Sequence, residues 1–212
     1  MLFTVSLLLI AVANAALDKS ILVTVKVTYG ELAYKRVLMW QEMIRDNQQR
    51  DIKAKLQAVN NFFNQVRFLS DIKHWKQEDF WATPLEMLIS NGGDCEDYSI
   101  AKFFTLKELG IPENNLRITY VKSLGLNQAH MVLIYAPKGK PPLVLDNLDK
   151  QIKPASERKD LKPVYSFNGR GLWKSKQRGR GKLIGGAEKI PPWRDLEKRM
   201  DREMLKSTLS GD

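Results

Sequence analysis

The hydrophobic pattern of this chain changes its period near Gly110 and Pro112, and this change restricts the fold more than any other feature. Upstream, apolar residues recur at intervals of three and four, which is the spacing of helices with one buried face. The pattern predicts two long amphipathic helices and a third that begins near Cys95. These helices span residues 31–49, 51–68 and 95–109. A shorter helix is expected from Pro84, because Thr83 is a favourable N-cap and proline suits the first helical turn.

Downstream of Pro112, apolar and polar residues alternate, which is typical of strands with one buried face. Strands are expected at residues 116–124, 129–136, 142–148 and 162–167. Glycine and proline in the short connections between the first three favour hairpins. Helices followed by an antiparallel sheet predict an α+β domain, with the helix that starts at Cys95 packed centrally on the sheet. The valine- and threonine-rich residues 21–28 are also expected to be extended, and residues 69–83 to form an irregular connection.

The single cysteine, Cys95, has the surroundings of a reactive thiol. It falls in the first turn of its predicted helix, where free backbone N–H groups and the helix dipole favour a thiolate. Gly92 and Gly93 favour a tight turn that leaves room for a substrate chain. The alternative is a structural cysteine, because free cysteine is often buried. The carboxylates of Asp94 and Glu96 argue against a dry core at this position, so we predict a nucleophile.

A base and an orienting acid for this thiol are expected on neighbouring strands. His130 opens the strand at residues 129–136, and Asp146 lies in the next apolar strand, where an unpaired carboxylate would be costly. If the two strands pair, their side chains can meet across the ladder. Considered singly, each residue has an ordinary structural role: His130 could be a hydrogen-bonded histidine within a strand, and Asp146 could be an acid that caps a turn. Together with Cys95 they predict a Cys–His–Asp triad, in which His130 moves the proton and Asp146 fixes its tautomer. His74 is expected to be a surface or half-buried residue.

Three motifs, in this order and spacing, resemble the transglutaminase-like superfamily. They are Gly93-Asp94-Cys95 at a helix start, Ala129-His130-Met131-Val132 on a strand and Val144-Leu145-Asp146-Asn147 on the next strand. The longer string NGGDCEDYSIAKFFTLKELGI, preceded by FWATPLEML, is similar to the bacterial transglutaminase-like cysteine proteases, and within them to the LapG-type periplasmic proteases. The resemblance covers roughly residues 20–170 and implies a papain-like α+β fold with a catalytic triad.

The same resemblance implies the biological setting of the protein. It implies calcium dependence and cleavage of a large cell-surface adhesin near a pair of alanines. It also implies an inhibitory partner, an inner-membrane cyclic-di-GMP receptor that sequesters the protease and thereby controls biofilm attachment.

Calcium is also suggested by the carboxylates of Asp94, Glu96 and Asp97 around the thiol. Uncompensated negative charge there would raise the pKa of Cys95, whereas a bound hard cation would neutralise it. The spacing fits equally well with acids that merely complement the helix dipole. The resemblance favours a calcium ion held by Asp94 and Glu96, with Asp97 a weaker candidate because it can point elsewhere on the helix.

The two ends of the chain predict export and a basic extension. The apolar run from Leu2 ends in the cleavage pattern Ala13-Asn14-Ala15, so residues 1–15 are predicted to be a signal peptide for export. The resemblance implies that the exported protein is periplasmic. Residues 16–170 are expected to form the protease domain and residues 171–212 a basic C-terminal extension. The net charge of +10 favours anionic partners. We interpret the glycine- and arginine-rich residues 169–182 as a solvated loop, not as a nucleic-acid-binding segment.

Two other functions fit the sequence. The same triad could transfer an acyl group from a glutamine to an amine, because only the access of water or amine to the acyl-enzyme separates the two reactions. The chain could also be a non-catalytic binding module. A cysteine peptidase further needs a second oxyanion donor, for which Trp40 and Trp81 are candidates between which the sequence does not choose.

Overall fold

The protein is described by a computed structural model that covers residues 19–176 and 179–209. The helices are α1 (Lys19–Tyr29), α2 (Glu31–Asn47), α3 (Ile52–Phe63), α4 (Asp71–His74), α5 (Pro84–Ser90), α6 (Cys95–Glu108) and α7 (Pro191–Leu209), with 3-10 turns at Glu113–Asn115 and Ala187–Lys189. The strands are β1 (Arg67–Phe68), β2 (Gly92–Gly93), β3 (Leu116–Ser123), β4 (Gln128–Tyr135), β5 (Leu143–Leu145), β6 (Lys153–Pro154), β7 (Leu161–Asn168), β8 (Gly171–Lys176) and β9 (Gly179–Gly185). The predicted signal peptide lies outside the described residues. In the part that is described, no helix is both long and apolar enough to span a bilayer.

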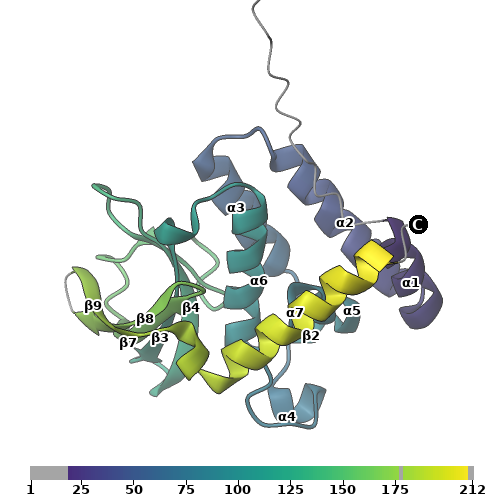
Figure 1. Cartoon of the computed structure of the whole chain (residues 1–212). Helices are drawn as coiled ribbons and strands as arrows, with labels where there is room; N and C mark the ends of the chain where they lie inside the picture. Colours follow the sequence, from purple (N-terminus) through teal and green to yellow (C-terminus); the bar gives the residue numbers. More distant parts are fainter. Residues whose placement is uncertain (1–18, 177–178, 210–212) are drawn as a thin grey trace, which may run out of the picture.

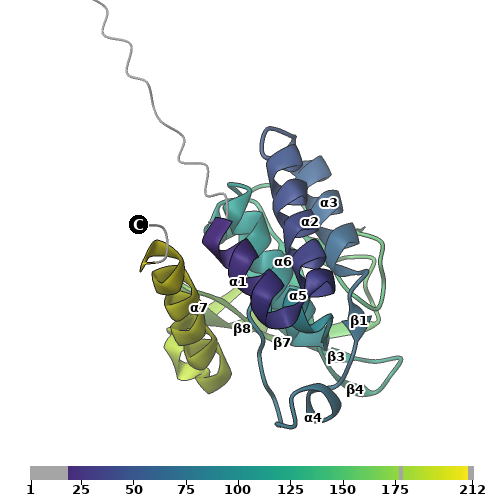
Figure 2. The same ribbon diagram turned by 90° about the vertical axis from the view of Figure 1, so that its right-hand side faces the viewer.

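A seven-stranded antiparallel sheet forms one layer of the molecule, in the order β6-β5-β4-β3-β7-β8-β9. Figures 1 and 2 show the helices gathered on one side of this sheet. The helix α6 packs directly on β4 and β3, and α3 and α5 pack against α6. Because α6 has neighbours on all sides, it is buried along most of its length. The predicted α+β architecture with a central helix is therefore confirmed.

The predicted hairpins set the position of the sheet relative to α6. Strands β3 and β4 pair over their full length, from Leu116 opposite Tyr135 to Ser123 opposite Gln128. The shorter β5 pairs with β4 only up to Leu145, which lies opposite Leu133. The part of β4 that precedes Leu133 is therefore not paired with β5, and Met131 in this part contacts Cys95 at the start of α6.

The expected strand at residues 21–28 is wrong, because these residues belong to the helix α1. Val25 is buried, and the half-buried Ile21 and Leu22 pack against the main core. Residues at this spacing lie along one face of a helix, and α1 packs along α2. Branching at the β-carbon lowers helix propensity only slightly, so burial of this face outweighs it.

The basic C-terminal segment is not the solvated loop that the sequence suggested. Strands β8 and β9 extend the sheet from β7, so the expected boundary at residue 170 falls at a turn within that sheet. The predicted final helix is present as α7. Its Trp193 is only 1% exposed and stacks on Phe104 at a centroid distance of 5.6 Å. The segment is therefore held by the same core as the helices.

Candidate active site

The start of α6 places Cys95 beside the part of β4 that is not paired with β5. The backbone N–H of Asp94 donates to Asp97 Oδ2 at 3.1 Å, which fixes the first turn of the helix. A Cβ on Gly93 would lie 2.6 Å from this same Oδ2, so glycine is needed there for close packing. This differs from the expected role of the two glycines, which pair as β2 with β1 and make room for protein side chains instead of substrate.

The environment of Cys95 favours the neutral thiol. The Sγ atom donates to Glu96 Oε2 at 3.2 Å and accepts a hydrogen bond from the backbone N–H of Met131 in β4. Burial raises the pKa of the thiol well above its usual range, and the negative charges of Glu96 and Asp94 raise it further. Burial and these two negative charges therefore oppose the expected stabilisation of a thiolate by the helix start.

The side chains of His130 and Asp146 form a buried pair next to this thiol. Nε2 of His130 lies 2.8 Å from Oδ1 of Asp146, and both residues are at most 3% exposed. Asp146 follows the last residue of β5, one position beyond the pairing of Leu145 with Leu133. The contact uses Nε2, so Nδ1 is the ring nitrogen left to meet another group.

The thiol and the imidazole are not hydrogen-bonded to each other in this structure. Among the described residues, no hydrogen bond joins Cys95 to His130; the thiol contacts the backbone of Met131, the next residue along β4. The structure therefore brings the imidazole and the carboxylate into contact and places the sulfur beside the same strand.

The carboxylate of Asp146 is held by further groups that the sequence did not indicate. Arg158 donates from Nη2 to Oδ2 at 2.8 Å, and the backbone N–H of Leu148 donates to Oδ1 at 3.0 Å. Burial by itself would raise the pKa of Asp146, but the hydrogen bonds from His130, Leu148 and Arg158 outweigh it and lower the pKa to about 2. The acid is therefore ionised at neutral pH, which suits an orienting group. Arg158 lies in a loop distant from the recognised motifs, so no sequence pattern pointed to it.

The backbone carbonyl of Asp146 is also fixed. Nζ of Lys102 donates to it at 3.0 Å and Nδ2 of Asn64 at 2.9 Å. Lys102 lies in α6 and is 1% exposed, and burial lowers its pKa to about 7. The sequence predicted that this helix buries only one apolar face, so it gave no reason to place Lys102 in the interior. Its burial follows from the packing of other elements on all sides of α6.

Two overlapping groups of acidic side chains lie beside the thiol, and one of them contains the expected ligand pair, Asp94 and Glu96. Oxygens of Asp71, Asp94 and Asp97 lie within 4.8 Å of one another, and a second group joins Asp94 to Cys95 and Glu96 at the same limit. Asp71 Oδ1 and Asp94 Oδ1 are buried without a hydrogen-bond partner in the described structure. Burial and repulsion from Asp94 raise the pKa of Asp71 to about 6. Unpartnered oxygens and mutual repulsion are suited to a hard divalent cation.

The group of Asp71, Asp94 and Asp97 adds two further candidate ligands to the expected pair. Asp97 does not point away but lies in the cluster, and Asp71, which the sequence analysis missed, joins it from α4. Glu96 accepts a hydrogen bond from the thiol. Burial, and to a smaller extent the contact with Asp94, raise the pKa of Glu96 to about 10. Asp71 was missed because α4 reaches the start of α6 only through the short pairing of β1 with β2.

Neither candidate indole is available as an oxyanion donor. Nε1 of Trp40 donates to Thr105 Oγ1 at 3.0 Å, and Nε1 of Trp81 donates to Asp79 Oδ1 at 2.8 Å. Both indoles belong to the core. His74 is half-buried, as expected.

This fold, with a thiol at the start of its central helix, defines the class of the protein as a cysteine peptidase with a transglutaminase-like fold. The chain belongs to the family of bacterial transglutaminase-like cysteine proteinases, BTLCP, whose sequence profile matches residues 39–161. No curated protein matches the chain.

Solved structures place the chain with LapG-type proteases. It is 42% identical to Legionella pneumophila LapG in an EGTA-treated form, with a TM-score of 0.77 over 86% of this chain and 96% of that one. A second structure of Legionella pneumophila LapG has the same identity, a TM-score of 0.76, and coverage of 86% and 95%. The calcium-bound form of that protein, also 42% identical, gives a TM-score of 0.74 and coverage of 86% and 99%.

Proposed function

We propose that this cysteine protease of the LapG type is a calcium-dependent periplasmic endopeptidase that uses Cys95, His130 and Asp146. The observation that carries the proposal is the buried His130–Asp146 hydrogen bond of 2.8 Å beside the helix that starts with Cys95. A histidine whose Nε2 is held by a carboxylate presents Nδ1 in a fixed orientation, as the nucleophile–base–orienter arrangement requires.

The proposed reaction begins when the Cys95 thiol exchanges its Glu96 partner for Nδ1 of His130. His130 takes the thiol proton, and the sulfur attacks the peptide carbonyl to form a tetrahedral adduct. The imidazolium, stabilised by Asp146, gives its proton to the leaving amine as the C–N bond breaks. A water molecule, deprotonated by His130, then hydrolyses the thioester and regenerates the thiol.

Calcium is proposed as the cofactor of this site. Its support is the cluster of Asp71, Asp94 and Asp97, with its two unpartnered buried oxygens, and the calcium-bound form of the similar Legionella protein. Asp94 belongs to both carboxylate groups, so we propose it as the central ligand, with Asp71 and Asp97 favoured over Glu96. A calcium ion would supply positive charge that favours the Cys95 thiolate.

The substrate and location are proposed from the family resemblance. We propose that residues 1–15 direct export to the periplasm, that the substrate is a large cell-surface adhesin cut near two alanines, and that an inner-membrane cyclic-di-GMP receptor is the inhibitory partner. Their support is the likeness of the chain to LapG-type proteases.

The test is cleavage of the N-terminal region of a candidate adhesin by purified residues 16–212, with calcium or with EGTA, and mapping of the cut by mass spectrometry. We expect one cut next to a di-alanine with calcium, and none with EGTA or with Cys95→Ala. Cleavage by Cys95→Ala would overturn the assignment of Cys95 as the nucleophile, and full activity in EGTA would overturn the calcium requirement. Incorporation of a fluorescent amine into the product, in place of hydrolysis, would show an acyl transferase instead.

A further inference from the structure

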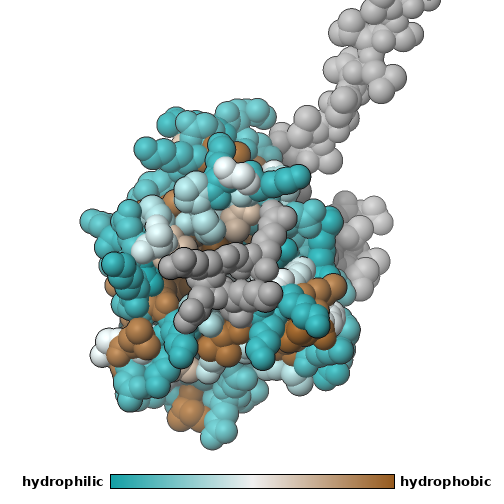
Figure 3. All heavy atoms as spheres, turned by 90° about the vertical axis from the view of Figure 1, so that its left-hand side faces the viewer, coloured by the Kyte–Doolittle hydropathy of each residue, from teal (hydrophilic) through white to brown (hydrophobic). Residues whose placement is uncertain are grey.

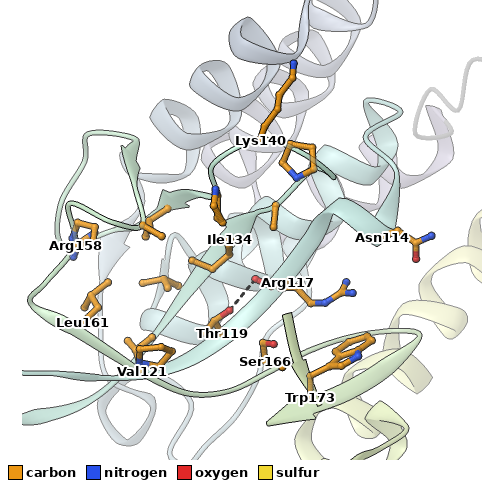
Figure 4. A pocket seen from close by; sticks show the side chains of 18 of the residues that line it. Asn114, Arg117, Thr119, Val121, Ile134, Lys140, Arg158, Leu161, Ser166 and Trp173 are labelled. Carbon is orange, nitrogen blue, oxygen red and sulfur yellow. Dashed lines mark hydrogen bonds between the residues drawn. The ribbon is translucent and has the colours of Figure 1, made fainter. Parts of the chain in front are cut away.

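The face of the sheet that carries no helices contains a groove of about 620 Å³, which we call the outer groove. Figure 3 shows this side of the molecule, where apolar patches lie between hydrophilic side chains. Figure 4 shows side chains from β3 and β4, including Val121 and Ile134, pointing into the groove, with Arg158 and Trp173 at its borders. The helix α6 packs on β4 and β3 from the side of the sheet that carries the helices. Arg158, which holds Asp146, is shared between the groove and the proposed active site.

The outer groove lies over a small apolar cluster of the sheet. Val121, Val132 and Val144 form a buried cluster distinct from the main core, with Ile134 and Leu161 packed against it. In an antiparallel sheet with helices on one face, the other face usually carries polar side chains. The three valines are at most 2% exposed, whereas Ile134 and Leu161 are half-buried and line the groove. These two side chains are therefore the apolar surface that a partner could contact.

The charged side chains that line the outer groove are all basic in the described parts of the chain. They are Arg117, Lys138, Lys140 and Arg158, of which Arg158 is already paired with Asp146 and Asp160. Both lysines are exposed at the rim, in the turn that connects β4 to β5. The groove therefore suits an occupant that carries negative charge.

A buried nitrogen of Arg158 marks a specific position for such a charge. Arg158 is 6% exposed, and its Nε and Nη2 atoms are bound to Asp160 and Asp146. Its Nη1 atom is buried and has no hydrogen-bond partner among the described residues. An unsatisfied buried donor is costly, and a carboxylate from an occupant would satisfy it with a charge-assisted bond.

We propose that the outer groove binds an acidic segment of another protein, with apolar side chains on Ile134 and Leu161 and carboxylates at Arg158 and the rim lysines. A nucleic acid is a poorer fit because Trp173, the aromatic side chain among the described lining residues, is already covered by the Arg117 guanidinium at 3.8 Å. A flat membrane surface is also a poorer fit, because these apolar side chains lie within a concave face. Since Arg158 also holds Asp146, an occupant would contact a residue that positions the proposed catalytic acid.

The experiment uses the Cys95→Ala form of the exported chain, so that no peptide is cut. The probe is a short fluorescent peptide of alternating glutamate and valine, whose valines share one face when extended. One control peptide replaces glutamate with glutamine, and another replaces valine with serine. The test variant is Lys138→Glu/Lys140→Glu, and its matched control is Lys35→Glu/Lys53→Glu, which makes the same change in charge on exposed lysines of α2 and α3.

We expect saturable binding of the glutamate–valine peptide that weakens about tenfold or more in the rim variant and stays within about twofold in the control variant. Neither control peptide should bind comparably. A photo-cross-linking version of the probe should attach to the outer faces of β3 and β4. The absence of saturable binding, equal weakening by both double variants, cross-linking near Cys95, or preferential binding of single-stranded DNA or anionic vesicles would each overturn the proposal. Each of these outcomes is independent of whether the protein cleaves an adhesin.

Discussion

The buried ammonium of Lys102 donates a hydrogen bond to the backbone carbonyl of Asp146 at 3.0 Å. Lys102 lies two turns along the helix that begins with Cys95, so the helix that presents the thiol also holds the chain that presents the acid. A single rigid element thereby sets the positions of two members of the proposed triad. Burial of a lysine costs stability, and this cost is consistent with a role in positioning.

Replacing Lys102 with methionine is expected to reduce kcat while leaving the protein at least as stable. The carbonyl of Asp146 keeps the hydrogen bond from Asn64, and removing a buried amine stabilises by about 1–2 kcal/mol at pH 6. Loss of the second donor lets Asp146 shift, and we expect kcat to fall about tenfold. Thermal unfolding and steady-state kinetics measure the two effects, with Lys107→Met on the same helix as the control. Unchanged kcat would contradict the positioning role.

The stability of the wild-type protein is expected to rise with pH because of this lysine. Burial lowers the pKa of Lys102 to about 7 from 10.5, so between these values the unfolded chain holds more protons than the folded one. The free energy of unfolding therefore increases as the pH rises from about 7 to about 10. The increase should be smaller in Lys102→Met, and identical pH dependence in both proteins would show that Lys102 is not desolvated.

Asp146→Asn is expected to lower kcat by about 10²–10⁴, because an amide cannot stabilise the imidazolium of His130 and favours the wrong tautomer. The substitution is nearly isosteric, so the fold should persist by circular dichroism. Asp149→Asn is the control, since its carboxylate pairs with Lys153 and not with the histidine. Retained activity in Asp146→Asn would remove this residue from the proposed triad.

The same residue is expected to stabilise the fold above acidic pH. The pKa of Asp146 is about 2 in the folded protein, against 3.8 for an ordinary aspartate. The contribution of its ionised carboxylate to the free energy of unfolding is therefore fully present above about pH 5 and is lost as the pH falls toward 2. The difference in free energy of unfolding between wild type and Asp146→Asn should shrink by about 2 kcal/mol over this range. A constant difference in urea unfolding from pH 5 to pH 2 would contradict the assignment.

Arg158→Lys is expected to separate the orienting role of this side chain from its charge. A lysine keeps the positive charge but cannot bind Asp146 and Asp160 at once through a planar fork. We expect a folded protein with kcat reduced about tenfold and KM unchanged. Arg158→Met should be less stable by about 3–5 kcal/mol, because it leaves a buried carboxylate without its cation. Arg45→Lys, on an exposed pair with Asp46, should change neither quantity.

Asp71→Asn is expected to have opposite effects without and with calcium. Without the ion, the substitution removes one of three mutually repelling carboxylates and should raise the melting temperature. With calcium, the stabilisation by the ion should be smaller than in wild type, because one ligand is weaker. Melting curves in EGTA and in calcium, with Asp51→Asn as an exposed control, measure both effects. Equal stabilisation of both proteins by calcium would exclude Asp71 as a ligand.

Elements whose signals lie within a few residues of one another could be predicted from the sequence, and elements that depend on distant partners could not. The start of α6 at Cys95 and the β3–β4 hairpin were predicted because caps, glycines and periodicity act within a few residues. The helix α1 was missed because the apolar residues of this short segment fit both a strand and a helix, and only packing on α2 decides between the two. The glycine- and arginine-rich segment was assigned to a loop because its strand pairing depends on β7, which its own residues do not reveal.

By itself, the sequence determined the family, the α+β class and the identity of the cysteine, histidine and acid that we propose for catalysis. Those features follow from residue types at short, characteristic spacings. Only the tertiary structure decided that Asp71 joins Asp94 and Asp97, that Lys102 and Arg158 hold Asp146, and that a basic groove with half-buried apolar side chains lies on the open face of the sheet. These contacts join segments that are far apart along the chain, and their energy depends on burial and mutual distance, which are set only when the helices and the sheet pack together.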